Sequence, residues 1–215
     1  GLIAINLREG DELLKVKVTR GDADIIIVSQ EGNAIKFNEQ DVRPMGRTAS
    51  GVKSMNLREN DIAVCMDIAV DDEELLVISE NGYGKRTPVS EYKRQNRGGV
   101  GLITYKISEK TGKVVGAIVC KNDDELMLIN TSGIAIRINV SDISVTSRSA
   151  MGVRLMRTSE EEKVVAIAKI AKTGDEEKDE QLSLEACADN EVVEANKDTS
   201  LDRLVEESQK EETEE

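Results

Sequence analysis

The sequence predicts an all-β fold of propeller-like blades, each made of four short antiparallel strands. Three observations predict it. An arginine followed four residues later by a glycine recurs at a fixed interval, in the pairs Arg47 and Gly51, Arg97 and Gly101, and Arg148 and Gly152. A continuously apolar run stands at the same place in each interval, and no helical period occurs before residue 173. The arginines lie 50 and 51 positions apart, an interval typical of one blade in an array.

The first two strands of each repeat differ in their patterning. The first alternates between polar and apolar residues, as in residues 14–18, and its counterparts are residues 62–69 and 114–119. The second is apolar throughout, in residues 25–28, 75–78 and 126–129. Alternation predicts a half-buried strand, whereas an unbroken apolar run predicts a strand that is covered on both faces.

The third strand follows a polar turn, and the fourth leaves the arginine loop. The turns are centred on Gly32, Gly82 and Gly133, and Asn81-Gly82 is a strong hairpin signal. The third strands alternate and end at the basic residues Lys36, Arg86 and Arg137. Glycine gives the arginine loops the backbone angles that tight turns need.

These patterns divide the chain into units. We expect a β-pinwheel over residues 1–173, with blades at about 11–60, 61–111 and 112–172. Residues 1–10 match 51–60 and therefore predict the last strand of a preceding unit, as in a piece of a longer protein. Open edges at residues 1–7 and 164–170 predict self-association, in which two chains could complete a ring.

The net charge of the chain lies in its last 42 residues. Residues 1–173 hold 25 Lys+Arg and 25 Asp+Glu, and residues 174–215 hold 4 and 17, so the difference of −13 equals that of the whole chain. Such an acidic, low-complexity segment predicts a disordered tail. Residues 182–194 and 201–206 could form helices, but both are too short to be stable alone.

Composition excludes several classes of site. The chain has no histidine, and Cys65, Cys120 and Cys187 lack the spacing of a metal site or a disulfide framework. The acidic runs 71–74 and 123–125 are typical of solvated loops. We therefore predict no catalytic residue, no metal and no cofactor. No apolar run approaches the roughly 20 residues of a membrane span, so we expect a cytoplasmic protein with no membrane partner.

Basic residues recur in phase with the repeat, which would give every blade a positive rim. The candidate DNA-binding residues are Lys36, Arg43, Arg47, Lys53, Lys85, Arg86, Lys93, Arg94, Arg97, Arg137, Arg148 and Arg154. Charge at a regular interval suits the phosphate backbone of a duplex. Three tyrosines and one phenylalanine are too few for the stacking platforms that single strands require. The alternative is that these residues are ordinary solvated side chains, and spacing alone leaves both open.

The loop at residues 95–101 carries a resemblance to a known family. It resembles the seven-residue box of the bacterial DNA gyrase A protein, whose pattern is Gln, basic, Arg, Gly, Gly, basic, Gly. Gln95, Arg97, Gly98, Gly99 and Gly101 fit that pattern, whereas Asn96 and Val100 stand where the family has basic residues. The loop therefore resembles a secondary, degenerate copy of the box. Residues 81–87 are also similar to gyrase, and the likeness covers residues 1–172.

The resemblance implies the second half of the C-terminal domain of the gyrase A protein, about three blades of a six-bladed pinwheel. Such a domain bends duplex DNA around a basic rim and supports ATP-dependent negative supercoiling. Neighbouring blades exchange strands in that family, and an acidic tail modulates wrapping. Its partners are the rest of the gyrase A protein and the gyrase B protein, in a heterotetramer. The DNA-cleaving tyrosine belongs to a separate region, so no tyrosine here takes that role.

Two other functions stay open from the sequence. One is the equivalent domain of DNA topoisomerase IV, in the protein that corresponds to gyrase A. The other is a protein-interaction propeller whose basic rim receives an acidic partner or the tail of the chain itself.

Overall fold

The computed structural model describes residues 1–159 and 161–170. The acidic tail, its two helix candidates and Cys187 lie outside the described residues. The described part is all-β, as the sequence predicts, and its helical elements are three turns of 3-10 helix, η1 (Glu39–Asp41), η2 (Val89–Glu91) and η3 (Val140–Asp142). No helix in this part of the chain is long and apolar enough to cross a membrane.

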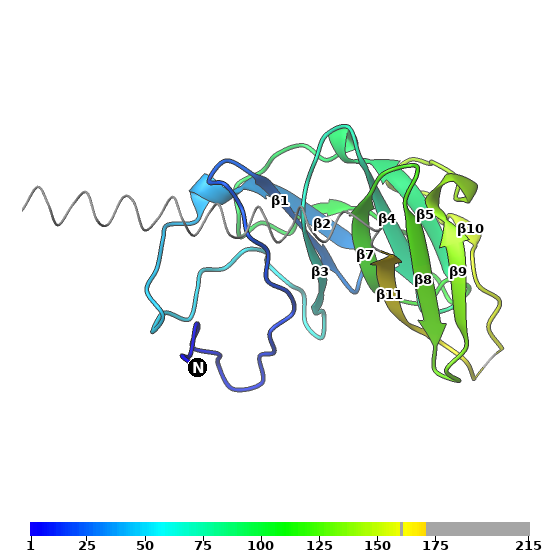
Figure 1. The fold of residues 1–215 in the computed structure, drawn as a ribbon, viewed down its shortest axis with the longest axis horizontal. Helices are drawn as coiled ribbons and strands as arrows, with labels where there is room; N and C mark the ends of the chain where they lie inside the picture. Colours follow the sequence, from blue (N-terminus) through cyan, green and yellow to red (C-terminus); the bar gives the residue numbers. More distant parts are fainter. Residues whose placement is uncertain (160, 171–215) are drawn as a thin grey trace, which may run out of the picture. The chain divides into compact units, whose positions relative to one another are not determined.

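Eleven strands form three antiparallel sheets in the described residues (Figure 1). Sheet A has the order β3 (Ala63–Ile68), β1 (Asp24–Ser29), β2 (Asn33–Asn38) and β6 (Leu102–Ile103). Sheet B has the order β10 (Val153–Arg154), β5 (Tyr83–Pro88), β4 (Glu74–Ser79) and β7 (Val114–Cys120). Sheet C has the order β11 (Val164–Ile170), β8 (Glu125–Asn130) and β9 (Ala135–Asn139).

Each sheet is built around one hairpin but takes its outer strands from later in the chain. In sheet A the hairpin is β1 and β2, with Ile27 opposite Ile35. The next repeat supplies β3, which pairs with β1, and β6, which pairs with β2. Sheet B repeats this arrangement with β7 and β10. Sheets A and B therefore each combine segments from two of the units at 11–60, 61–111 and 112–172, whereas all three strands of sheet C lie within 112–172.

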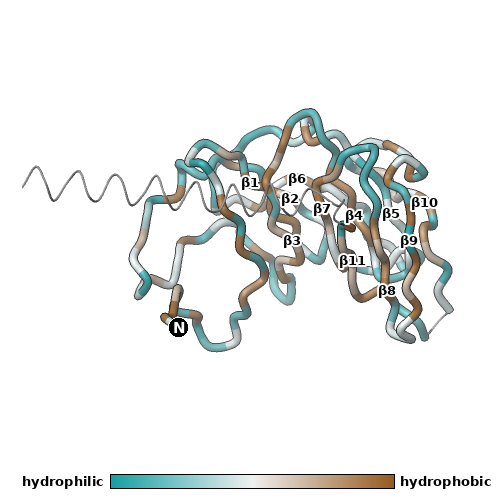
Figure 2. The backbone as a smooth tube through the Cα atoms, in the orientation of Figure 1, coloured by the Kyte–Doolittle hydropathy of each residue, from teal (hydrophilic) through white to brown (hydrophobic). Residues whose placement is uncertain are grey.

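The apolar second strand β4 lies between two sheets, as its unbroken patterning predicts. Leu75 and Val77 of β4 pack toward sheet A, whereas Leu76 and Ile78 pack toward sheet C. All four side chains are buried. Figure 2 shows apolar residues along the strands and mostly hydrophilic residues in the turns that join them. Alternate residues of a strand point to opposite faces, so a strand between two sheets must be apolar at every position.

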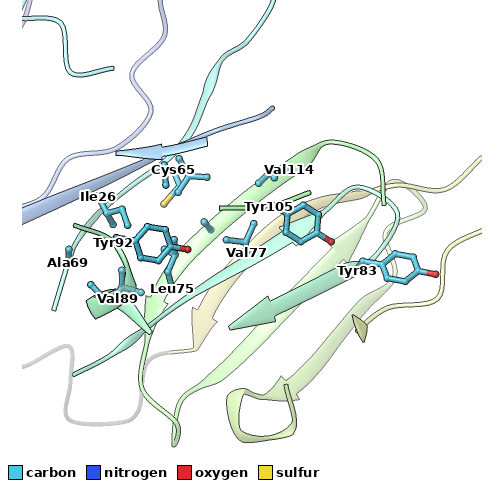
Figure 3. Packing of buried hydrophobic residues seen from close by; sticks show 14 residues of the cluster. Ile26, Cys65, Ala69, Leu75, Val77, Tyr83, Val89, Tyr92, Tyr105 and Val114 are labelled. Carbon is cyan, nitrogen blue, oxygen red and sulfur yellow. The ribbon is translucent and has the colours of Figure 1, made fainter. Parts of the chain in front are cut away.

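Aromatic residues complete the cluster between sheets A and B. Figure 3 shows the ring of Tyr92 among Ile26, Leu75 and Val89. Tyr105 lies in the same cluster, and both tyrosines are almost fully buried. These rings fill space in the core, so they offer no exposed platform for bases.

Two strands predicted near the N-terminus are absent. Residues 1–7 and 14–18 have no strand assignment, and their apolar side chains are exposed, with Leu2 at 80% and Val16 at 71%. Their counterparts 102–103 and 114–118 are strands, because each pairs with a hairpin earlier in the chain. Alternation is typical of a strand, but a strand forms only where the edge of a sheet offers hydrogen-bond partners to its backbone.

The turn glycines provide a test of strand exchange. Gly82 and Gly133 share a positive φ of 77°, but a Cβ at Gly82 would collide with the carbonyl oxygen of Met156, whereas nothing lies within 4 Å of one at Gly133. Alanine at either site should cost about 1–2 kcal/mol for the left-handed backbone. We expect Gly82→Ala to lower the free energy of unfolding by about 1–3 kcal/mol more than Gly133→Ala. Equal losses in urea titrations would contradict this tight approach.

Candidate nucleic-acid interface

Two of the three arginine loops, those of Arg97 and Arg148, are seated on the sheet of the preceding repeat. The chain enters the Arg97 loop through a parallel bridge between Arg94 and Lys36, and the backbone N–H of Gln95 donates to the Lys36 carbonyl at 2.7 Å. It leaves through Gly101, where any Cβ would collide with the carbonyl of Ala34. This contact is the physical reason for glycine at the end of the loop, together with its φ of +81°.

The loop of the next repeat is seated in the same way. A parallel bridge joins Arg86 and Val145, and the N–H of Thr146 donates to the Arg86 carbonyl at 2.8 Å. Gly152 lies against the carbonyl of Gly84, as Gly101 lies against that of Ala34. Two successive loops thus stand at equivalent edges of two successive sheets.

The guanidinium groups in these loops are held by uncharged acceptors. The exposed Arg97 donates from Nε to the Asp41 carbonyl at 2.9 Å and from Nη1 to the Lys53 carbonyl at 3.1 Å. Arg148 donates from Nη1 to the Ile103 carbonyl at 3.3 Å and lies 6.0 Å from the centre of the Tyr92 ring. Carbonyls orient a guanidinium without cancelling its charge, so both arginines stay able to attract an anion.

The remaining exposed candidates fall into two groups. Arg43, Arg47, Lys53 and Lys93 form no ion pair within the described residues. Arg94 pairs with Asp24 at 2.8 Å, and Arg137 pairs with Glu125. Ion pairs this exposed contribute little to stability, so a phosphate could replace the carboxylate partner.

Three candidates are not on an exposed rim. Lys36, Lys85 and Arg86 are 5%, 0% and 5% exposed, which corrects the expectation that third-strand cations offer free charge. Lys36 Nζ donates to Asp71 at 2.8 Å, and its pull lowers the pKa of that carboxyl. The alternation of apolar and polar residues predicts that a residue lies on a strand. It does not show whether a neighbouring repeat covers the side chain of that residue.

Arg86 links sheet B to two later segments. Its Nε donates to the Ile143 carbonyl at 2.8 Å, and its Nη1 donates to Glu74 and to Asn122, both at 3.0 Å. A buried guanidinium with these partners is satisfied where it lies. Arg86 therefore fixes the segment that leads into the Arg148 loop.

Lys85 supports that loop directly, a role that sequence reasoning missed. Its Nζ donates to the carbonyls of Ser147, at 2.6 Å, and of Arg148. Burial lowers the pKa of Lys85 to about 8, while the charge of Glu91 raises it and that of Arg148 lowers it. The signal in the sequence is a lysine where the other repeats have Ile35 and Ile136.

A second basic cluster surrounds the hydroxyl of Tyr83, and it combines the predicted Arg154 with Lys110 and Lys163, which sequence reasoning missed. Arg154 donates to this hydroxyl at 2.6 Å, and its guanidinium lies 5.2 Å from the ring centre. Lys110 lies 5.4 Å from the same ring, and Lys163 lines the same cavity of about 400 Å³. The three cations come from segments that only strand exchange brings together, so no local pattern could have revealed the cluster.

The cysteines agree with the interpretation of small buried hydrophobes. Cys65 and Cys120 are buried and unpaired, and burial raises the pKa of each thiol to about 12. A thiol with such a pKa is unreactive at neutral pH. Among the described residues, no group of Cys, Asp or Glu is arranged to hold a metal ion.

Comparison with known families agrees with this geometry. The profile described as "DNA gyrase C-terminal domain, beta-propeller" matches residues 1–20, 23–64, 73–121 and 124–171. The chain belongs to this family. The DNA gyrase A protein of Clostridium acetobutylicum is 71% identical over 177 residues, which cover 82% of this chain and 21% of that protein. The DNA gyrase A protein of Staphylococcus aureus is 44% identical over 185 residues, which cover 85% and 21%.

Solved structures of the family share the fold. The DNA gyrase A C-terminal domain matches with a TM-score of 0.74 and 32% identity, over 80% of this chain and 58% of that one. The C-terminal domain of DNA topoisomerase IV also matches with a TM-score of 0.74, at 27% identity over 78% and 52%. The chain spans about a fifth of the length of the curated gyrase relatives that it matches.

The lowered pKa of Lys85 predicts a pH dependence of stability. The folded pKa is about 8, against an ordinary value of 10.5, so between these values the unfolded chain binds more protons than the folded chain. Stability from this group therefore rises with pH in that window. As the pH rises through this window, we expect the free energy of unfolding of the unmodified chain to rise by up to about 3 kcal/mol relative to that of Lys85→Met.

Urea titrations from pH 7 to pH 10 would measure this difference. The exposed Lys110→Met variant is the matched control and should show no such trend relative to the unmodified chain. A constant difference between the unmodified chain and Lys85→Met across this range would show that Lys85 is not desolvated in the folded state.

Proposed function

We propose that the chain is a DNA-binding and DNA-wrapping module of a gyrase A protein. It bends duplex DNA along its arginine loops and so supports ATP-dependent negative supercoiling by the rest of the enzyme. The observation that carries the proposal is that Arg97 and Arg148 stand in equivalent loops on successive sheets, oriented by carbonyls rather than neutralised. A curved duplex presents phosphates at regular intervals, which such repeated contacts can follow.

The exposed cations and the half-buried Arg148 have different positions relative to the DNA. Arg47, Arg97 and Arg148 contact phosphates from the loops, and Arg43, Lys53, Lys93 and Arg154 extend the contact on either side. Arg94 and Arg137 exchange their carboxylate partners for phosphate. Lys36, Lys85 and Arg86 hold the loops in place from below. Binding of this kind depends on backbone charge and carries little base sequence information.

The aromatic residues support a duplex ligand. Phe37, Tyr92 and Tyr105 are buried, so they are not available to stack on unpaired bases. Burial also raises the pKa of Tyr92, and that of Tyr105 to about 12, the opposite of what an activated nucleophile needs. These values support a non-catalytic module whose partners, the rest of the gyrase A protein and the gyrase B protein, supply the cleavage and ATP chemistry in the cytoplasm.

One alternative has a specific observation in its favour. The topoisomerase IV domain matches with the same TM-score as the gyrase domain, so the fold does not separate the two enzymes. The gyrase relative at 71% identity favours gyrase. In either enzyme, we propose that the acidic residues 174–215 compete with DNA for the cations of the loops, most strongly at low salt.

The central role of Arg97 predicts a change in salt dependence. Arg97→Ala should weaken binding to all duplexes about equally and flatten the slope of log affinity against log salt by about 0.9, because one phosphate contact is lost. Arg97→Lys keeps the charge and should keep most of the slope. Fluorescence anisotropy with two unrelated duplexes over a range of salt would measure both effects.

Arg58→Ala is the matched control, because Arg58 is exposed but outside the candidate set. It should leave the slope unchanged. The proposal fails if the triple variant of Arg47, Arg97 and Arg148 to Ala stays folded and retains both affinity and salt slope. The basic loops would then be turns with solvated arginines.

A further inference from the structure

The hydroxyl of Tyr83 lines the cavity of about 400 Å³ and has a proton to donate. Figure 3 shows the Tyr83 ring at the edge of the apolar cluster, with its hydroxyl directed away from the other labelled side chains. The residue is 6% exposed. Nε and Nη2 of Arg154 donate to the hydroxyl oxygen, at 3.2 and 2.6 Å. A tyrosine hydroxyl is a donor as well as an acceptor, and this one donates to no acceptor among the described residues.

Two cations lie beside the same ring without a carboxylate partner. The guanidinium of Arg154 lies 5.2 Å from the centre of the Tyr83 ring, and Nζ of Lys110 lies 5.4 Å from it. Neither cation forms an ion pair within residues 1–159 and 161–170. Glu109 also lines the cavity, but it pairs with no cation in that part of the chain. Like charges gathered at one ring repel each other, so an anion beside both would be attracted.

The amide of Asn81 holds the segments around the cavity in place. Its Nδ2 donates to the carbonyls of Glu109 and Lys110, at 3.1 and 3.2 Å. Its Oδ1 accepts from Nζ of Lys163 at 2.8 Å. Lys163 also lies 3.5 Å from Glu80, so its charge is partly compensated. These bonds fix the turn that carries Lys110 before any ligand arrives, and a site arranged in advance loses less entropy on binding.

The cluster belongs to sheet B and has no equivalent in sheet A. Arg154 lies opposite Tyr83 at the outer edge of sheet B, whereas Ile103 lies opposite Asn33 at the same place in sheet A. Sheet B is the middle sheet, packed on sheet A through one apolar cluster and on sheet C through another. Contacts that recur in successive repeats suit a continuous backbone, whereas a cluster found in one of these two sheets suits a discrete anion.

We propose that Tyr83, Lys110 and Arg154 form a binding site for a phosphate group. The hydroxyl of Tyr83 donates to one phosphate oxygen, and the guanidinium N–H groups that do not contact this hydroxyl donate to another. Lys110 supplies a second positive charge beside the anion. The cavity has the size of sites for small molecules, about 300–1,000 Å³. The phosphate comes either from free inorganic phosphate or from the backbone of a bound duplex, and the first source does not require the proposed DNA wrapping.

Isothermal titration calorimetry of the full chain with inorganic phosphate, at constant ionic strength in chloride, tests the site. We expect saturable binding of one phosphate per chain. Arg154→Gln and Tyr83→Phe should each weaken it at least about tenfold, because each removes a hydrogen bond to a charged group. Lys110→Gln should weaken it several-fold, and it changes an exposed side chain, so the fold does not depend on it.

The matched controls are Arg157→Gln and Lys106→Gln. Both residues are exposed and lie close in sequence to Arg154 and Lys110, but neither lines the cavity. They should leave phosphate binding unchanged. This titration contains no DNA, so its outcome is separate from that of the Arg97→Ala test.

A second arm with duplex DNA separates the two sources of phosphate. If the backbone supplies it, Arg154→Gln should flatten the slope of log affinity against log salt by about 0.9, and inorganic phosphate should compete with the duplex at constant ionic strength. If free phosphate is the ligand, the slope should stay unchanged while Arg154→Gln still weakens phosphate binding. The proposal is overturned if the unmodified chain shows no saturable phosphate binding, or if the control variants weaken it as much as Arg154→Gln and Lys110→Gln.

Discussion

The approach of one repeat's strand to the hairpin of the preceding repeat determines the rest of the structure. The strands β6 and β10 are only two residues long, but each is followed by two N–H groups that donate to a turn carbonyl, and each follows a glycine that lies against the edge strand. The arginine loop ends at that glycine, so the same contact fixes the point on the sheet at which the loop ends. A side chain at Gly101 or Gly152 would move the strand, and the loop arginine would move with it.

Buried cations strengthen this arrangement. Their loss of hydration costs free energy, and their hydrogen bonds offset that cost. Lys36, Lys85 and Arg86 lose most of their hydration, and each recovers interactions with carbonyls or carboxylates of a later repeat. Removing one partner of such a set would leave an unsatisfied charge, which costs more than losing an exposed ion pair. The repeated basic residues therefore have two roles. Those under the loops hold neighbouring repeats together, and those in the loops remain available to a polyanion.

The repeat and its strands could be predicted from the sequence because both depend on local patterns. Apolar runs such as residues 75–78 predicted buried strands, and the glycine turns at Gly32, Gly82 and Gly133 lie where expected. The pairing of those strands could not be predicted from patterning, because an alternating segment does not specify its neighbour. Residues 14–18 show this limit, since they stand at the place of β7 in the repeat but pair with no strand in the described chain.

The candidate site, like the fold, was predictable only where it depends on patterns within one repeat. The loop arginines were found because their spacing repeats, and of these Arg47 and Arg97 are exposed whereas Arg148 is half-buried. The burial of Lys36 and Arg86 was missed because it arises from a segment more than 50 residues away. Lys110 and Lys163 were missed for the same reason, since contacts between distant segments place them beside Tyr83.

Bending of duplex DNA is the central claim, and energy transfer between dyes at the two ends of a short duplex tests it most directly. On addition of the chain, transfer should increase for duplexes of unrelated sequence, and the increase should be lost with Arg97→Ala combined with Arg148→Ala. Binding that leaves the end-to-end distance unchanged would contradict the account, because the loops would then hold DNA without bending it.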